Sequence, residues 1–164
     1  MREDRMRRED RLISEIETRS ILEKTKIGRI GMCIENQPYV IPVLYLYSSE
    51  DNSIYIHSAT KGRKMETLGK NPNVCFEVDE LKRIVVETDI CNCTAEYESA
   101  IVFGKASLVN HEKRTEILHR LSQKYGVETD PNTPIEQGTL ERTAVIKITI
   151  DRMTGKANSP KRIS

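Results

Sequence analysis

The chain has 164 residues, enough for one domain with a substantial hydrophobic core. Its 26 lysines and arginines nearly balance 25 aspartates and glutamates, and the formal net charge is only +1, which argues against a protein that binds nucleic acid through its overall charge. No apolar run reaches the roughly 18–20 residues of a membrane span, and the N-terminus is charged rather than signal-like, so we expect a cytoplasmic protein without a membrane partner.

Residues 1–12 form a run of mixed charge, which we interpret as an N-terminal arm. Five arginines alternate with four acidic residues before the first apolar segment. Such a segment cannot bury itself, and its acids weaken any attraction to nucleic acid. We therefore expect a solvated arm rather than a nucleic-acid contact.

The next residues predict one helix followed by a series of strands. Ser14 with Glu17 three residues later matches a capping box, and the helix should end near Lys26, with Gly28 after it. Alternating apolar residues, bounded by turn residues, predict the strands. We expect strands at 29–35, 39–47, 54–58, 73–79, 97–110 and 143–150, with a weaker signal at 84–86, helices after Gly62 and over 111–126, and a turn at Thr154-Gly155.

A proline inside the second strand helps to define the architecture. Pro42 has no N–H to donate to a ladder, so it belongs at a sheet edge, a bulge or a barrel rim, where backbone groups stay free for a ligand. Gly104 predicts a bend in the fifth strand. Five or six strands with long antiparallel members and no βαβ rhythm favour a small closed barrel with peripheral helices over a doubly wound sheet.

The stretch between the third strand and the short helix is typical of a phosphate site. Small residues, among them Ser58 and Thr60, lead into a helix start that carries Lys61, Arg63 and Lys64. The free N–H groups of a first helical turn favour an anion, and the arginine fork and lysine charge add charge-assisted hydrogen bonds. A solvated basic turn is the alternative, and these residues alone leave both interpretations open.

The four cysteines indicate no metal site. Cys33 and Cys75 lie in apolar strand-like runs and are expected in the core. Cys91 and Cys93 form a C-x-C pair without a second pair at metal-site spacing, which supports a metal or redox role only weakly. A structural disulfide is not expected in a cytosolic chain.

Several motifs, taken together, resemble a known family. In chain order they are Pro42-Val43-Leu44, Tyr55-Ile-His-Ser58, Gly62-Arg-Lys64, Asn71-Pro72-Asn-Val-Cys-Phe76 and Tyr97-Glu-Ser-Ala-Ile-Val-Phe-Gly104. Over residues 22–155 the chain resembles the FMN-binding split-barrel family of the pyridoxamine 5'-phosphate oxidases, and most nearly the branch that includes the 5-nitroimidazole resistance proteins. The resemblance implies a mainly β domain over 13–155, a six-stranded antiparallel split β-barrel with short flanking helices, followed by a basic tail at 156–164.

The resemblance also implies a homodimer with FMN in the cleft between the subunits. Arg63 and Lys64 match the basic pair that grips the flavin phosphate, and Lys61 lies beside them. The other matching positions are His57 and Ser58 beside the phosphate and ribityl chain, Pro42, Val43 and Leu44 along the isoalloxazine ring, and Ser99 as a polar strand residue that contacts the flavin.

The chain departs from the pyridoxamine phosphate oxidases at its C-terminus. Its tail has no histidine to help grip a substrate phosphate, so vitamin B6 oxidation is not expected. His57 is a candidate catalytic residue that passes protons near neutral pH, or alternatively a strand residue that only bonds the phosphate or a backbone carbonyl. His111 and His119 are expected on the surface.

The leading hypothesis for function is an FMN-dependent oxidoreductase. It would pass electrons from a reduced nicotinamide or deazaflavin donor to a small aromatic or nitro compound, and the nicotinamide would bind only transiently because the chain has no G-x-G-x-x-G motif. The alternative is a flavin-binding or flavin-storage protein without turnover of its own. Haem or nucleic-acid binding is a third hypothesis, and the content of 0 tryptophans and 2 phenylalanines disfavours nucleic-acid binding by base stacking.

Overall fold

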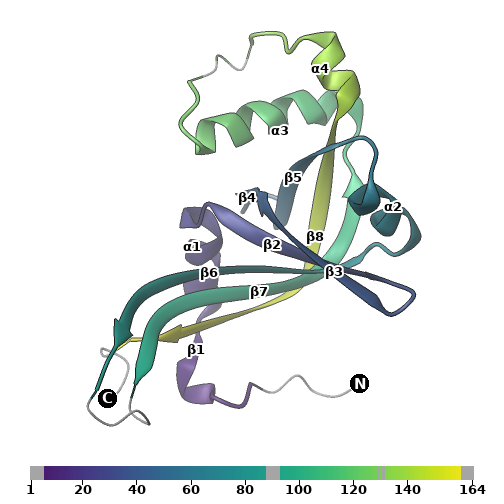
Figure 1. Ribbon diagram of the computed structural model, residues 1–164. Coiled ribbons are helices and arrows are strands. Elements are labelled where there is room, and N and C mark those ends of the chain that lie inside the picture. Colours follow the sequence, from purple (N-terminus) through teal and green to yellow (C-terminus); the bar gives the residue numbers. More distant parts are fainter. Residues whose placement is uncertain (1–5, 88–92, 129, 131, 160–164) are drawn as a thin grey trace.

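The computed structural model describes residues 6–87, 93–128, 130 and 132–159. Its centre is one sheet in the order β3-β2-β6-β7-β8-β5-β4, with β1 paired to β8, and the strand pairs within these ranges are antiparallel (Figure 1). The strands are β1 (Leu12–Ile13), β2 (Ile27–Ile34), β3 (Gln37–Leu44), β4 (Leu46–Ser48), β5 (Ser53–Ala59), β6 (Asn73–Val85), β7 (Thr94–Leu108) and β8 (Thr143–Asn158). The helices are the 3-10 helix η1 (Glu9–Arg11), α1 (Glu15–Lys24), α2 (Arg63–Lys70), α3 (His111–Lys124) and α4 (Gln137–Arg142).

The fold is the predicted split β-barrel, with eight strands rather than six. The two additional strands are short: β1 has 2 residues and β4 has 3. Strands β3 and β4 are the two ends of the sheet, so the barrel remains split on that side. The core lies on the concave face, where aliphatic side chains of alternate strand residues pack around a few aromatic rings, namely Ile30, Tyr45, Ile54, Ile56, Phe76, Val78, Val102, Ile146 and Ile148.

Glycines explain two places where the sequence-based boundaries are wrong. Gly28 lies inside β2, and Gly155 lies inside β8, where we expected a helix end and a turn. A Cβ at Gly28 would overlap the ring of Phe76, and one at Gly155 would overlap Thr18 of α1. Both glycines allow a close approach between packed elements, which is a common reason for glycine inside a strand.

The bend expected at Gly104 is confirmed. Phe103 pairs with Arg152 whereas Gly104 pairs with Ile150, so β8 has one extra residue at this point, a β-bulge. A Cβ on Gly104 would overlap the carbonyl oxygen of Thr149. Beyond the bulge, β6, β7 and the second half of β8 curve away together from the helical end of the molecule (Figure 1).

The capping box of the first helix is also confirmed. The Ser14 hydroxyl accepts a hydrogen bond from the Glu17 N–H, and the Glu17 carboxylate accepts one from the Ser14 N–H at 2.9 Å. Among the described residues, none of the helices is long and apolar enough to cross a membrane.

Helix α3 lies with α4 over one end of the sheet (Figure 1). The hydroxyl of Tyr125, at the C-terminal cap of α3, accepts a hydrogen bond from the N–H of Tyr45 at 2.8 Å. It donates its hydrogen to the carbonyl of Lys26 at 2.7 Å or of Tyr45 at 2.9 Å. Tyr45 itself separates β3 from β4 in the segment that we expected to be one strand, so this contact joins α3 to the crossing between the two edges of the sheet.

Candidate functional site

The corner between β5 and α2 is built as the sequence predicts. Strand β5 ends at Ala59, and Gly62, with φ 114°, turns the chain into α2. A side chain at this φ would be strained, which favours glycine here. The first turn of α2 has no side-chain cap, so its N–H groups remain available to an anion.

Three positive charges gather at this corner. Lys61 and Arg63 are exposed, and Lys64 is half-buried. In the part of the chain that the structure describes, none of the three forms an ion pair with a carboxylate. Burial lowers the pKa of Lys64, because desolvation disfavours its charged form. An anion bound here would supply the missing counter-charge.

Arg63 is held in place by an aromatic ring. Its guanidinium lies 4.2 Å from the ring centroid of Tyr39 in β3. This contact brings α2 against the edge strand β3, far from it in sequence. Tyr39 is not among the predicted site residues, because no local pattern indicates that it meets the helix.

His57 and Ser58 are neighbours in β5 but point to opposite faces of the strand. Ser58 is buried on the face of Ile54 and Ile56, whereas His57 lies on the face that α3 covers. His57 remains exposed to solvent on one side, but partial desolvation and the nearby Lys64 charge both lower its pKa, so the neutral imidazole predominates at pH 7. Of this pair, His57 is the side chain that lies near a cation of the corner.

Pro42 lies on an edge strand, as predicted. It pairs with Arg29 of β2, and no strand within the described ranges pairs with the other side of β3. Proline has no N–H, so it fits at a position where the backbone nitrogen points away from the neighbouring strand. Backbone direction alternates along a strand, so the N–H and C=O groups of Val40 and Leu44 point to the open edge as well. The side chains divide differently: Pro42 and Leu44 are exposed, whereas Val43 packs against the core.

Ser99 lies far from the other predicted site residues within one chain. It is on β7, paired with Asp79 of β6, and its hydroxyl lies 3.5 Å from the Lys156 carbonyl. Strands β2 and β6 lie between β7 and β3, so Ser99 is three strand spacings, about 14 Å, from the strand of Pro42. A single chain therefore does not bring Ser99 and Pro42 to one ligand.

The cysteines lie elsewhere than expected. Cys33 and Cys75 are half-buried on the outer face of the sheet, because alternation gives the core positions to Met32 and Val74. Cys93 is exposed, and Cys91 lies outside the described residues, so its predicted role is not addressed by the structure. Within the described ranges, no group of three or more His, Cys, Asp or Glu side chains could hold a metal ion.

A cavity of about 450 Å³ that the sequence does not predict adjoins the corner. Leu44 of β3 and His57 of β5 line it together with residues of α3, α4 and the segment between them. His119, which we expected on the surface, is buried there, and its Nε2 lies 3.1 Å from the Thr133 carbonyl. His111 is exposed, as expected. No motif signals this cavity, since its walls come from distant parts of the chain.

Comparison with known proteins gives the family. A family model described as pyridoxamine 5'-phosphate oxidase matches residues 14–157. The chain belongs to this family. The resemblance stated from the motifs is thereby confirmed.

Solved structures agree with the family and the fold. A proposed 5-nitroimidazole antibiotic resistance protein from Bacteroides thetaiotaomicron VPI-5482 is 26% identical, with a TM-score of 0.76 over 88% of this chain and 85% of that one. An FAD-binding protein from Mesorhizobium loti is 25% identical, with a TM-score of 0.63 over 91% and 98% of the two chains. The FAD and heme binding protein from Mycobacterium smegmatis, at 16% identity, shares the fold, with a TM-score of 0.79 over 92% and 77%.

A curated relative adds little about activity. An uncharacterized protein from Rhizobium meliloti (strain 1021) is 29% identical over 70 residues. The matched segment is 43% of this chain and 44% of that protein. The chain therefore matches less than half the length of this relative.

Proposed function

We propose that this protein is an FMN-dependent oxidoreductase that passes electrons from a reduced nicotinamide or deazaflavin donor to a small aromatic or nitro compound. The observation that carries the proposal is the corner between β5 and α2, where Lys61, Arg63 and Lys64 meet the start of a helix without a carboxylate partner in the described chain. The flavin, when bound, would supply the electron transfer, while the protein would position it and tune its potential.

The corner favours FMN among the flavins. A terminal phosphate monoester carries a charge of about −1.5 to −2, which matches several cations gathered at one point. Each phosphate of a dinucleotide carries less charge and lies within a longer chain. The FAD named for the relatives from Mesorhizobium loti and Mycobacterium smegmatis is therefore the competing cofactor that experiments must separate from FMN.

The open edge of β3 suits the ring of the same ligand. Carbonyl and N–H groups that point away from β2 at Val40, Pro42 and Leu44 can pair with the polar edge of an isoalloxazine ring. Since these contacts use the backbone, the apolar side chains at this edge are compatible with the role. In this arrangement the side chains of Leu44 and His57 would lie next to the isoalloxazine ring.

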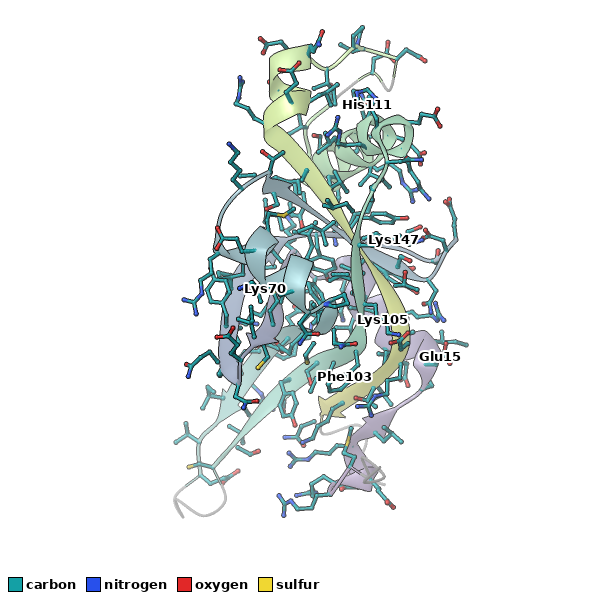
Figure 2. The ribbon with its side chains drawn as sticks, turned by 90° about the vertical axis from the view of Figure 1, so that its right-hand side faces the viewer. Glu15, Lys70, Phe103, Lys105, His111 and Lys147 are labelled. Carbon is teal, nitrogen blue, oxygen red and sulfur yellow. The ribbon has the colours of Figure 1, made fainter. Side chains whose placement is uncertain are left out.

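A second subunit would complete the site. The outer face of the sheet carries large apolar side chains at solvent, among them Val40 at 62% exposure, Ile101 at 39% and Phe103 at 37%. In Figure 2, Phe103 lies on the lower half of the sheet, away from the helical end that His111 marks. Apolar patches of this kind mark interaction surfaces. If two copies pack through this face, Ser99 of one subunit can approach the β3 edge of the other, which one chain alone does not allow.

Removing the two charges at the helix start tests the phosphate site. We expect the double variant Arg63→Ala/Lys64→Ala to bind FMN at least ~100-fold more weakly, because each charge-assisted hydrogen bond contributes about 1.5–3 kcal/mol. The dissociation constant is measured by quenching of flavin fluorescence. Lys70→Ala, at the exposed end of the same helix, is the matched control and should bind FMN as the wild type does. Equal affinity of the double variant and the control would place the phosphate elsewhere.

Anaerobic reduction tests turnover. We expect NADH, NADPH or a reduced deazaflavin to bleach the visible absorbance of the bound flavin, because an oxidoreductase must accept electrons from one of these donors. Subsequent addition of an aromatic nitro compound should restore the absorbance. A flavin that none of these donors reduces would instead support the alternative, a flavin-binding or flavin-storage protein.

The association state tests the shared site. We expect the flavin-loaded protein to sediment as a dimer, and Ile101→Glu to yield a monomer that has lost most of its flavin, because a charge would be buried at the centre of the apolar face. Ile16→Glu on α1 introduces the same charge at a side chain with 80% exposure and should leave both properties unchanged. A wild-type monomer that binds FMN tightly would refute the shared site.

A further inference from the structure

The cavity beside the corner is separate from the groups that we assign to the phosphate. It lies under α3 and α4, at the helical end of the sheet, and has a volume of about 450 Å³, within the range of small-molecule sites. Most of its lining is aliphatic, with leucines, a valine and an isoleucine forming the walls. The aliphatic members are Leu44, Leu118, Leu121, Val127 and Ile135.

The polar groups of the cavity are mostly used by the protein itself. Tyr125 directs its hydroxyl to the backbone of Tyr45 and Lys26, and the Nε2 of His119 lies at the Thr133 carbonyl. Among the described residues, the cavity lining includes no Asp, Glu, Lys or Arg side chain. A charged ligand would therefore lose its hydration without gaining a counter-charge, at a cost of several kcal/mol.

A few polar groups remain available to a ligand. The imidazole of His57 makes no hydrogen bond within the described part of the chain, and Ser122 also lines the cavity, whereas the hydroxyl of Thr139 already donates a hydrogen bond to the Glu136 carboxylate at 3.2 Å. With its pKa lowered by burial and by Lys64, His57 is neutral at pH 7 and can donate or accept one hydrogen bond. The cavity thus offers apolar walls with a small number of neutral polar groups.

Two residues join the cavity to the proposed flavin site. Leu44 ends the open edge of β3, and His57 lies near Lys64 at the corner. A molecule in the cavity would therefore lie next to the flavin without touching the cations that hold the phosphate.

The helix α3, which covers the cavity, is held by the Tyr125 hydroxyl and by the ammonium of Lys124, which lies 3.8 Å from the ring centroid of Tyr45.

We propose that this cavity binds the electron acceptor, and that the acceptor is an uncharged, mainly apolar ring compound with one hydrogen-bonding group. The role of this compound as electron acceptor rests on the proposed function, but its binding to the cavity does not depend on the flavin. Phosphorylated and carboxylated compounds are excluded by the lack of a counter-charge in the lining.

A matched pair of probes tests the charge selection. We use 2-naphthol, which is neutral at pH 7, and 2-naphthoate, which has the same ring system and a negative charge. Binding is followed by saturation-transfer NMR on the full chain, both with FMN and without it. We expect 2-naphthol to bind at least tenfold more tightly than 2-naphthoate in both forms, and equal or tighter binding of 2-naphthoate would overturn the inference.

Filling the cavity tests the location. Ser122→Phe on α3 should reduce the affinity for 2-naphthol at least tenfold, and Thr139→Leu on the short helix α4 is a milder second variant that should act in the same direction. Glu112→Phe, on an exposed position of α3, is the matched control and should bind 2-naphthol as the wild type does. Unchanged affinity in both filled variants, with folding verified by circular dichroism, would overturn the location.

The same variants separate this inference from the proposed function. If Ser122→Phe retains FMN but loses 2-naphthol, the cavity is a second site beside the flavin, as proposed. If it loses FMN as well, the flavin ring itself occupies the cavity and the inference is wrong. If the wild type binds 2-naphthol but no FMN, the cavity stands and the proposed function fails.

Discussion

The proposed site depends on a set of cations at the start of α2 that have no carboxylate partner among the described residues. Elsewhere the protein pairs its charges readily, as Arg29 does with Glu77 at 3.0 Å and Lys147 with Asp51 at 3.0 Å. At the corner, burial lowers the pKa of Lys64. Burial also lowers the pKa of Lys124 in α3, to about 8, but that ammonium lies over the ring of Tyr45, whereas the cations of the corner lie together at a helix start. A bound anion at the corner would supply the counter-charge that these cations lack.

The barrel determines what can lie beside that anion. Because the sheet ends at β3 and β4 instead of closing, an edge with free backbone groups runs toward the corner. Tyr45 crosses from one edge to the other, and its ring meets Phe76 edge-on with centroids 4.9 Å apart. Helix α3 is attached to this crossing by Tyr125, so the opening of the barrel and the cavity under α3 share one rigid support. Phosphate, ring and acceptor would thus occupy adjoining places in one continuous region.

Local signals predicted the elements that local chemistry determines. The capping box at Ser14, the turn at Gly62 and the bend at Gly104 each follow from the conformational needs of one or two residues, and the structure confirms them. Gly28 and Gly155 misled the prediction, because a glycine that allows close packing looks the same in sequence as one that ends an element.

Contacts between distant segments could not be predicted from local patterns. The stacking of Arg63 on Tyr39 and the burial of His119 depend on how α2 and α3 pack, which no pattern within either helix specifies. The resemblance to the family predicted that Arg63 and Lys64 act together in the corner between β5 and α2. It could not show that Ser99 lies three strands from Pro42, which is a property of the strand order.

In the proposed function, the corner between β5 and α2 recognises the phosphate of a flavin mononucleotide. Calorimetric titration of the flavin-free protein with FMN and with riboflavin, which lacks only the phosphate, tests it most directly. We expect FMN to bind at least ~100-fold more tightly than riboflavin, with an affinity that falls as the salt concentration rises. Equal affinity for the two flavins, insensitive to salt, would contradict it.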